Sequence, residues 1–233
     1  MKQKSKTLRV LVQGMRQFDW SHFHPRSMDR HRLYLALRAM IRPLSSVADM
    51  KDEKAGSLLL ANGICLGMFV VSALEFAFTG FPFNYNDPDR FNFFLILLSS
   101  SVLLFLWTVA NWGICSLLDG EGTFQQVWIV TCYAMLPRVL FTPPMILISR
   151  ILTLEEQGLY QMISALLLLW CGILLMLGMM VVHQYTVRRT VASVLLSIAG
   201  IAVILFIAML FFSMGQQLVA FVETVVSELR YRM

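Results

Sequence analysis

Five long runs of apolar residues, separated by short polar stretches, dominate the pattern of this chain. They cover roughly residues 57–78, 91–110, 127–148, 159–181 and 191–212, with the second open to extension through Leu118. Each run holds about 20 residues, the length of a helix that crosses ~30 Å of hydrocarbon at ~1.5 Å per residue. Long runs without alternation of polar and apolar positions are helices rather than barrel strands. The pattern therefore predicts five transmembrane helices.

The segment before these runs carries narrower apolar stripes. In residues 1–18 the apolar positions have helical spacing and the basic residues lie largely off the stripe, which favours a helix on the membrane surface. A disordered basic tail is the alternative. A signal peptide is disfavoured, because the apolar core is short and interrupted and no small-residue cleavage site follows. Residues 33–41 read as a short helix that Pro43 ends.

The tail after the runs also has an apolar stripe. Leu218, Phe221, Val222 and Val225 share one helical face in residues 216–229, which predicts an amphipathic helix along the outer surface. Three parts follow from these patterns. They are a basic cytoplasmic or membrane-surface segment (1–56), a five-helix transmembrane domain (57–215) and an amphipathic C-terminal helix (216–233).

Composition supports the membrane assignment. The 233 residues are 58% hydrophobic and 14% charged, whereas a soluble domain carries roughly a quarter charged residues. Most of the chain is therefore expected to lie in lipid, as an all-α polytopic membrane protein. Gly172 and Gly178 suit helix contacts in the fourth run, although their spacing is not that of a G-x-x-x-G pair.

The positive charge is concentrated at one end of the chain. Residues 1–56 hold twelve lysines and arginines against five acids, a charge of +7. The remaining residues hold seven against nine, a charge of −2, which gives the net charge of +5. Beside a membrane span, anionic lipid headgroups are favoured over nucleic acid as the partner of such a segment. The positive-inside rule places the N-terminus in the cytoplasm. Five spans then leave the C-terminus outside and put Asp119, Glu121 and His183 on the cytoplasmic side.

Neither a metal site nor an enzyme is indicated by the motifs. The four cysteines lie in or beside apolar runs without a C-x-x-C pair, and His22, His24 and His31 are loosely spaced with no acid or cysteine to complete a cage. P-loop, H-E-x-x-H and G-x-S-x-G patterns are absent from the sequence. We therefore expect no cofactor, no metal and no catalytic residues.

A polar turn, Asp119-Gly120-Glu121-Gly122 followed by Thr123, joins the second and third runs. One interpretation is an acidic cytoplasmic site, with His183 nearby, for a proton, a cation or a basic loop of a partner. The favoured alternative is structural. The glycines supply a positive φ for a tight connection, and the acids solvate the turn or cap the next helix. His183 by itself is typical of an interfacial residue.

The third run contains Pro137, Pro143 and Pro144, each of which removes a backbone donor and is expected to break the helix. Arg138 lies beside the first of these prolines near mid-span, and the nearest acid for it is Glu75. Broken helices often line the binding sites of transporters, so Glu75, Pro137, Arg138 and His183 form a candidate polar path. The alternative, which we favour, is a packing kink with an arginine that snorkels.

The motifs resemble the Yip family (Ypt-interacting proteins), and specifically its bacterial members. The similar stretches are A-N-W-G-I-C-S-L-L-D-G-E-G-T-F, Y-A-M-L-P, I-L-T-L-E-E-Q-G-L-Y and H-Q-Y-T-V-R-R-T-V. Arg138 directly after the proline departs from the family pattern. The resemblance implies five transmembrane helices, a cytoplasmic N-terminus and no catalytic residues. Binding of Rab-type GTPases by eukaryotic members does not carry over to a bacterial protein.

The expected function is non-enzymatic. The resemblance suggests an adaptor, assembly or accessory factor for another integral membrane complex, such as an ABC transporter, in a bacterial cytoplasmic membrane. Residues 119–123 would form its cytoplasmic contact, and the basic N-terminal segment would lie on anionic lipid headgroups. The alternative is a transporter of a small molecule, an ion or a lipid that uses the broken third helix.

Overall fold

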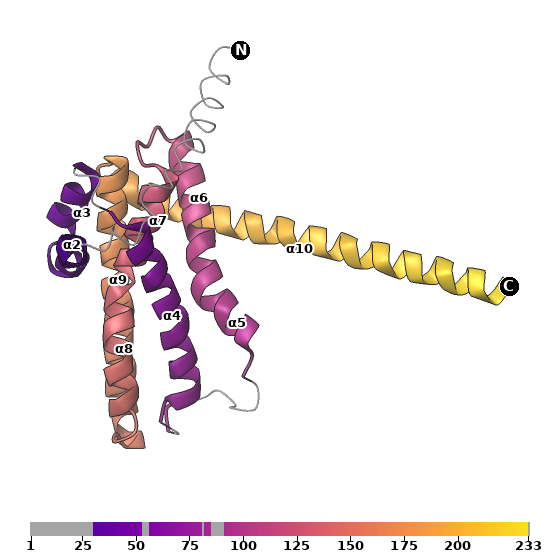
Figure 1. The fold of residues 1–233 in the computed structure, drawn as a ribbon, viewed down its shortest axis with the longest axis horizontal. Helices are drawn as coiled ribbons and strands as arrows, with labels where there is room; N and C mark the ends of the chain where they lie inside the picture. Colours follow the sequence, from indigo (N-terminus) through magenta and orange to yellow (C-terminus); the bar gives the residue numbers. More distant parts are fainter. Residues whose placement is uncertain (1–29, 53–55, 81, 85–90, 233) are drawn as a thin grey trace, which may run out of the picture.

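The structure is a computed structural model that describes residues 30–52, 56–80, 82–84 and 91–232 (Figure 1). Every regular element in these ranges is a helix, which confirms the predicted all-α class. The expected surface helix at 1–18 and the histidines His22 and His24 lie outside the described residues. The elements are α2 (Arg30–Ile41), α3 (Pro43–Asp52), α4 (Leu58–Phe78), α5 (Phe93–Leu97), a π-helical turn (Leu98–Val102), α6 (Leu103–Leu117), α7 (Phe124–Ala134), α8 (Leu136–Ile148), a 3₁₀ turn (Leu154–Glu156), α9 (Gln157–His183) and α10 (Val187–Arg232).

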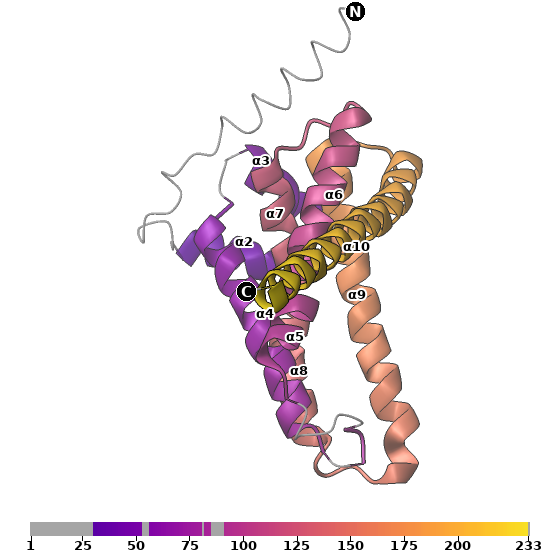
Figure 2. The ribbon, with the colours of Figure 1, turned by 90° about the vertical axis from the view of Figure 1, so that its right-hand side faces the viewer.

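Five helical segments in the described part of the chain are long and apolar enough to cross a membrane, which confirms the predicted number. They are Leu58–Phe78, Phe93–Leu117, Phe124–Ile148, Leu154–His183 and Val187–Glu228. The first four run along one bundle with alternating direction (Figures 1 and 2). We call the end with residues 118–123 and 184–186 the turn end, and the end with Gly80 and Ser149 the opposite end.

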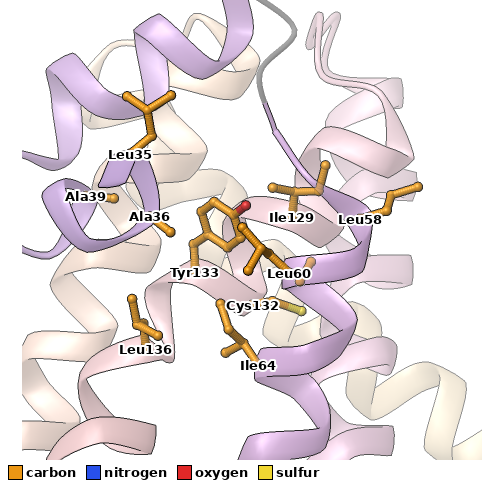
Figure 3. Close-up of a cluster of buried hydrophobic side chains, with 11 residues drawn as sticks. Leu35, Ala36, Ala39, Leu58, Leu60, Ile64, Ile129, Cys132, Tyr133 and Leu136 are labelled. Carbon is orange, nitrogen blue, oxygen red and sulfur yellow. The ribbon is translucent and has the colours of Figure 1, made fainter. Parts of the chain in front are cut away.

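Helix α7 lies at the centre of this bundle. It contacts α4, α6 and α9, and seven of its eleven residues are buried. In the most apolar stretch of the third span 61% of the residues are buried, against 33%, 22% and 28% in the corresponding stretches of the first, second and fourth spans. Figure 3 shows the apolar cluster that joins α7 to its neighbours, which includes Leu35 and Ala39 of α2, Leu60 and Ile64 of α4, and Ile129 and Tyr133 of α7. The third span is therefore the core on which the other helices pack.

Helices α2 and α3, from the basic N-terminal segment, pack against the bundle. Leu35 of α2 is 2% exposed in the cluster of Figure 3, and Val47 of α3 packs with Val127 and Val182. An ion pair of 3.0 Å between Arg38 Nη1 and Asp49 Oδ2 joins the two helices. The described part of this segment thus has a protein-facing side, and its contact with lipid headgroups stays a prediction.

The third span is broken between α7 and α8, as the first of its prolines predicts. Helix α7 ends at Ala134, and the Met135 amide donates a tight hydrogen bond of 3.0 Å to the Cys132 carbonyl. Pro137 lies in the first turn of α8, where a missing N–H leaves no helical bond unmade. The prediction was wrong for Pro143 and Pro144, because α8 continues through them to Ile148. Neighbouring helices let a membrane helix tolerate such prolines.

Gly178 lies at a helix contact, as predicted, and Gly172 does not. A Cβ atom on Gly178 would collide with the Val130 side chain, so the bare glycine allows α9 to approach α7 closely. A Cβ atom on Gly172 would meet nothing within 4 Å. The close contact therefore falls at the more buried half of α9, toward the turn end.

Helix α10 is one continuous helix of 46 residues. We expected a span that ends near residue 212 and a separate helix from 216, but no helix end occurs there. Gly215 is the only breaker in that stretch, and a single glycine costs a helix only about 1 kcal/mol. After packing on α6 and α9, α10 runs across the other spans and projects beyond them (Figures 1 and 2). Only 6% of its most apolar window is buried in this chain.

Candidate functional site

The turn after α6 closes around an aspartate rather than a glycine. Asp119 has φ 59°, in the left-handed region, and the Gly120 amide donates a 2.8 Å hydrogen bond to the Cys115 carbonyl. This is the bond that closes a helix C-terminus through a left-handed residue. The predicted reason for the glycines was wrong, because no described glycine has a positive φ. Aspartate tolerates the left-handed conformation better than most residues do.

Gly120 and Gly122 are glycines because their neighbours lie too close for a side chain. A Cβ atom on Gly120 would lie 2.7 Å from the Tyr185 hydroxyl, and one on Gly122 would lie 2.7 Å from His183 Cε1. Asp119 and Glu121, which alternate with them, are exposed. The turn therefore packs its glycines against the protein and presents its two acids outward.

Thr123 begins helix α7. The backbone N–H of Gln126 donates to Thr123 Oγ1 at 3.3 Å, and the backbone N–H of Thr123 donates to Gln126 Oε1 at 3.1 Å. This reciprocal pair is a capping box, which satisfies two amides of the first helical turn. The helix is thus capped by Thr123 and not by either acid of the turn.

A second turn, after α9, packs against the first and has the same geometry. Gln184 has φ 56°, and the Tyr185 amide donates to the Met180 carbonyl at 3.0 Å. The Tyr185 hydroxyl shares its hydrogen between the Cys115 and Leu118 carbonyls, at 3.1 Å each. Burial raises the pKa of Tyr185 to about 12. Tyr185 therefore stays neutral and holds the end of α6 through its last carbonyls.

His183, which ends α9 at the turn end, belongs to a buried polar network, and its position at the membrane interface stays a prediction. It is 2% exposed, and its Nε2 lies 3.3 Å from Asn111 Oδ1. The Asn111 amide group donates to Ser197 Oγ at 3.1 Å, so Oδ1 is the acceptor and His183 Nε2 carries the hydrogen. The network joins α6, α9 and the beginning of α10. Sequence reasoning missed Asn111 and Ser197, although a polar residue within an apolar run was available as a signal.

Arg138 pairs with Glu75, the acid that the sequence offered as its nearest partner. Arg138 Nη2 lies 3.2 Å from Glu75 Oε2, and the two side chains are 32% and 35% exposed. Arg138 comes from the first turn of α8, directly after the break, and Glu75 from the last turn of α4. The pair therefore ties two spans together within the apolar bundle.

A cavity of about 210 Å³ adjoins this ion pair. Its walls come from the last turn of α4, from one face along α8 and from the first half of α9. The polar lining residues are Glu75, Arg138, Thr142, Tyr160 and Ser164. Sequence reasoning did not single out Tyr160, Thr142 or Ser164, because nothing in the pattern shows which face of α9 meets α8.

The predicted polar path is thus divided into two separate sites. His183 lies beside Gly120 and Gly122 at the turn end, whereas Glu75 and Arg138 lie toward the opposite end. Apolar side chains of α7 and α9, such as Val130 and Met179, pack between the two regions. Among the described residues, no group of three or more histidine, cysteine or acidic side chains is placed to hold a metal ion.

Comparison with known proteins gives a match at the level of the family. A family model described as the Yip1 domain matches residues 37–211, well over half of the chain. That range contains the polar turn, the broken third span and the His183 turn, so it confirms the resemblance drawn from those motifs. Neither the curated proteins nor the solved structures give a match.

Proposed function

Because the chain belongs to the Yip1 domain family of membrane proteins, we propose that it is a non-enzymatic adaptor that binds and assists another integral membrane complex. The proposed partner is a membrane complex such as an ABC transporter, in a bacterial cytoplasmic membrane. The charge of the N-terminal segment favours a cytoplasmic N-terminus, which places the turn end on the cytoplasmic side.

The observation that carries this proposal is the exposed length of α10. At about 1.5 Å per residue, its 46 residues extend for roughly 69 Å, whereas about 20 residues cross the hydrocarbon. In the structure this helix runs across the other spans, and its tail projects beyond them (Figure 1). There its stripe is bare, with Leu218 and Phe221 each 66% exposed. An apolar stripe that the rest of the chain leaves uncovered marks an interaction site, and the proposed occupant is a helix of the partner protein.

The acidic turn supports a second contact with the partner, away from the α10 tail. Asp119 and Glu121 project from a backbone that Tyr185 and the two close-packed glycines hold in place. Such fixed carboxylates suit a basic loop of the partner, since charge complementarity selects partners and orients them.

Purification from native membranes in mild detergent, followed by identification of what accompanies the protein, tests the adaptor proposal. We expect a membrane complex in fixed ratio with the protein. The double change Phe221→Gln and Val225→Gln, on the stripe, should reduce its recovery at least about tenfold, since two buried apolar anchors are lost. The matched control is Ala220→Gln with Thr224→Gln, on the other face of the same turns.

The acidic turn is tested in the same preparation by Asp119→Asn with Glu121→Gln. Asparagine also accepts a positive φ, so the turn keeps its shape while it loses both charges. Weaker recovery with normal membrane insertion supports the second contact. A protein that purifies without any partner, or stripe and control variants that recover it equally, would overturn the adaptor proposal.

Transport is the second candidate, and the ion pair beside the broken helix favours it. In reconstituted vesicles, Arg138→Leu should abolish translocation of a fluorescent zwitterionic phospholipid while the protein stays folded, because the path loses its cation. Unimpaired translocation in that variant would count heavily against a route along the third span.

A further inference from the structure

We propose that the cavity between α4, α8 and α9 holds the headgroup of one zwitterionic phospholipid, with its phosphate on Arg138 and its ammonium on Glu75. The chemistry recognised is a small group that carries an acidic oxygen group and an ammonium. The proposal concerns a bound lipid and holds whether the protein acts as an adaptor or as a transporter.

The charges of the cavity are the first reason. Glu75 and Arg138 are the only Asp, Glu, Lys or Arg residues in helices α4 to α9. A single hydrogen bond of 3.2 Å joins their side chains in the described part of the chain. A guanidinium has five N–H donors and a carboxylate has two acceptor oxygens, so most of their bonding capacity is left for a ligand. In a membrane span such capacity is expensive to leave unused.

The sign of the charges selects a zwitterion. Arg138 attracts a phosphate, but Glu75 beside it repels one, so a purely anionic ligand meets both effects. A ligand with an ammonium next to its phosphate satisfies both side chains at once. Hydroxyl groups of Thr142, Tyr160 and Ser164 line the same cavity and suit the remaining phosphate oxygens.

Size and depth fit a headgroup rather than a larger molecule. The volume of about 210 Å³ is below the roughly 300–1,000 Å³ of pockets that enclose drug-sized ligands. Glu75 lies three residues before the end of α4 at Phe78, and Tyr160 three residues after α9 begins at Gln157. At about 1.5 Å per residue, Glu75 and Tyr160 lie within ~5 Å of the helix ends, which is the depth of headgroups. The backbone of Arg138 lies deeper, near mid-span, and its guanidinium reaches this depth at the Glu75 carboxylate.

Part of the cavity wall belongs to a face of α9 that the rest of the chain leaves uncovered. Its lining includes Ala165 and Leu168 of α9, and Leu168 is 59% exposed. Both belong to a candidate membrane span, so the surface they form faces the bilayer. A lipid can therefore enter sideways and leave its acyl chains against the apolar face of α9. This route favours a lipid over a soluble zwitterion.

Native mass spectrometry of the delipidated full chain tests the proposal. The probes are dioctanoyl phosphatidylethanolamine, dioctanoyl phosphatidylglycerol and free O-phosphoethanolamine. We expect one phosphatidylethanolamine per chain, bound at least about tenfold more tightly than phosphatidylglycerol, since one charge-assisted hydrogen bond is worth that much. Free O-phosphoethanolamine should give no adduct at the same concentration, because it lacks the acyl chains.

The variant Glu75→Gln with Arg138→Gln removes both charges together and should weaken phosphatidylethanolamine binding at least about tenfold. Glu155→Gln is the matched control, an exposed carboxylate at the same end that does not line the cavity, and should bind normally. Ser164→Leu fills the cavity and keeps the ion pair, so it decides the matter if the double variant fails to fold. Equal binding by Ser164→Leu and the unchanged protein, or equal binding of the two lipids, would overturn the proposal. Tight binding of free O-phosphoethanolamine would overturn the proposal that the ligand is a lipid and would favour a soluble zwitterion.

Discussion

In the D-G-E-G turn, two different local requirements select the residues: a left-handed backbone at one position and the lack of space for a side chain at two others. The left-handed position is Asp119, and the two glycines occupy positions where Tyr185 and His183 leave no room for a Cβ atom. Conformational freedom and close packing both favour glycine in a sequence, and only the structure separates them. The two acids are exposed because the glycines that alternate with them pack closely against Tyr185 and His183.

Replacement of Gly122 by alanine tests this packing. The new Cβ atom would lie 2.6 Å from Val182 Cγ1 and 2.7 Å from His183 Cε1, so we expect a loss of about 1–3 kcal/mol. The melting temperature in detergent should fall by roughly 2–4 °C per kcal/mol. Gly113→Ala is the control, since its Cβ atom meets nothing within 4 Å and alanine favours a helix. Equal melting shifts in the two variants would contradict the packing role.

Replacement of Tyr185 by phenylalanine tests the hydroxyl contact and its pH dependence. Loss of the bond to the Cys115 and Leu118 carbonyls should cost about 1 kcal/mol. The pKa is raised from 10.0 to about 12 in the fold by burial, so the unfolded chain ionises first. The hydroxyl's contribution is therefore complete below pH 10 and is lost as pH rises through 12.

The measurement is the difference in unfolding midpoint between wild type and Tyr185→Phe in detergent. Wild type should be the more stable at pH 8, and the gap should narrow steadily above pH 10. Groups that titrate in both proteins cancel in this difference. A gap that stays constant from pH 8 to pH 11 would contradict the assignment.

Among the elements, α4 and α8 are joined by the ion pair of Glu75 and Arg138. Removal of one charge leaves the other within an apolar span, so Glu75→Gln and Arg138→Gln should each destabilise the protein by about 1–2 kcal/mol. The double variant should cost less than the sum of the two, with a coupling energy above about 0.5 kcal/mol.

The wild type, the two single variants and the double variant form a double-mutant cycle. The unfolding free energies of these four proteins in detergent give the coupling energy. The pair of Arg38 and Asp49 is a suitable comparison, because its side chains are similarly exposed, at 30% and 42%, but lie outside the candidate spans. Its coupling should stay below about 0.5 kcal/mol, as is usual for pairs in water. Equal coupling for the two pairs would show that the span environment adds nothing.

The sequence predicts these elements well where one local cause decides the outcome. Apolar run length determines the five spans, and Pro137 determines the break in the third. The partner of Arg138 also followed, since Glu75 is the only acid within the apolar runs of the bundle. Pro143 and Pro144 were misjudged, because neighbouring helices decide whether a membrane helix tolerates a missing donor.

Contacts between distant elements could not be predicted in the same way. The network of Asn111, His183 and Ser197 depends on which faces of three helices meet. The polar residues mark a face on each helix, but the sequence does not show which of these faces meet. The direction of α10 depends on its contacts with α6 near its start. Thr190, Ser193 and Ser197 recur at helical spacing and are buried on the side that meets α6, but their spacing does not encode the angle of the crossing.

For the molecule as a whole, the orientation in the membrane stays a prediction. The basic N-terminal segment and the five spans predict that the turn end faces the cytoplasm. In cells that produce a variant without Cys65, a membrane-impermeant maleimide should label Glu155→Cys directly and Glu121→Cys only after permeabilisation. Ser227→Cys should be labelled from outside if the C-terminus lies there. The reverse pattern for residues 121 and 155 would overturn the orientation.

The burial of the third span has a consequence for how the protein is made. This span has the lowest mean hydropathy of the five and the largest share of buried residues. Arg138 lies near the middle of the span, and an arginine at that depth resists transfer from the translocon into lipid. During translation α4 is made before α8, so Glu75 has been synthesised before Arg138 leaves the ribosome. We therefore expect the third span to insert beside the first, with Arg138 paired to Glu75, so that the order of synthesis contributes to folding.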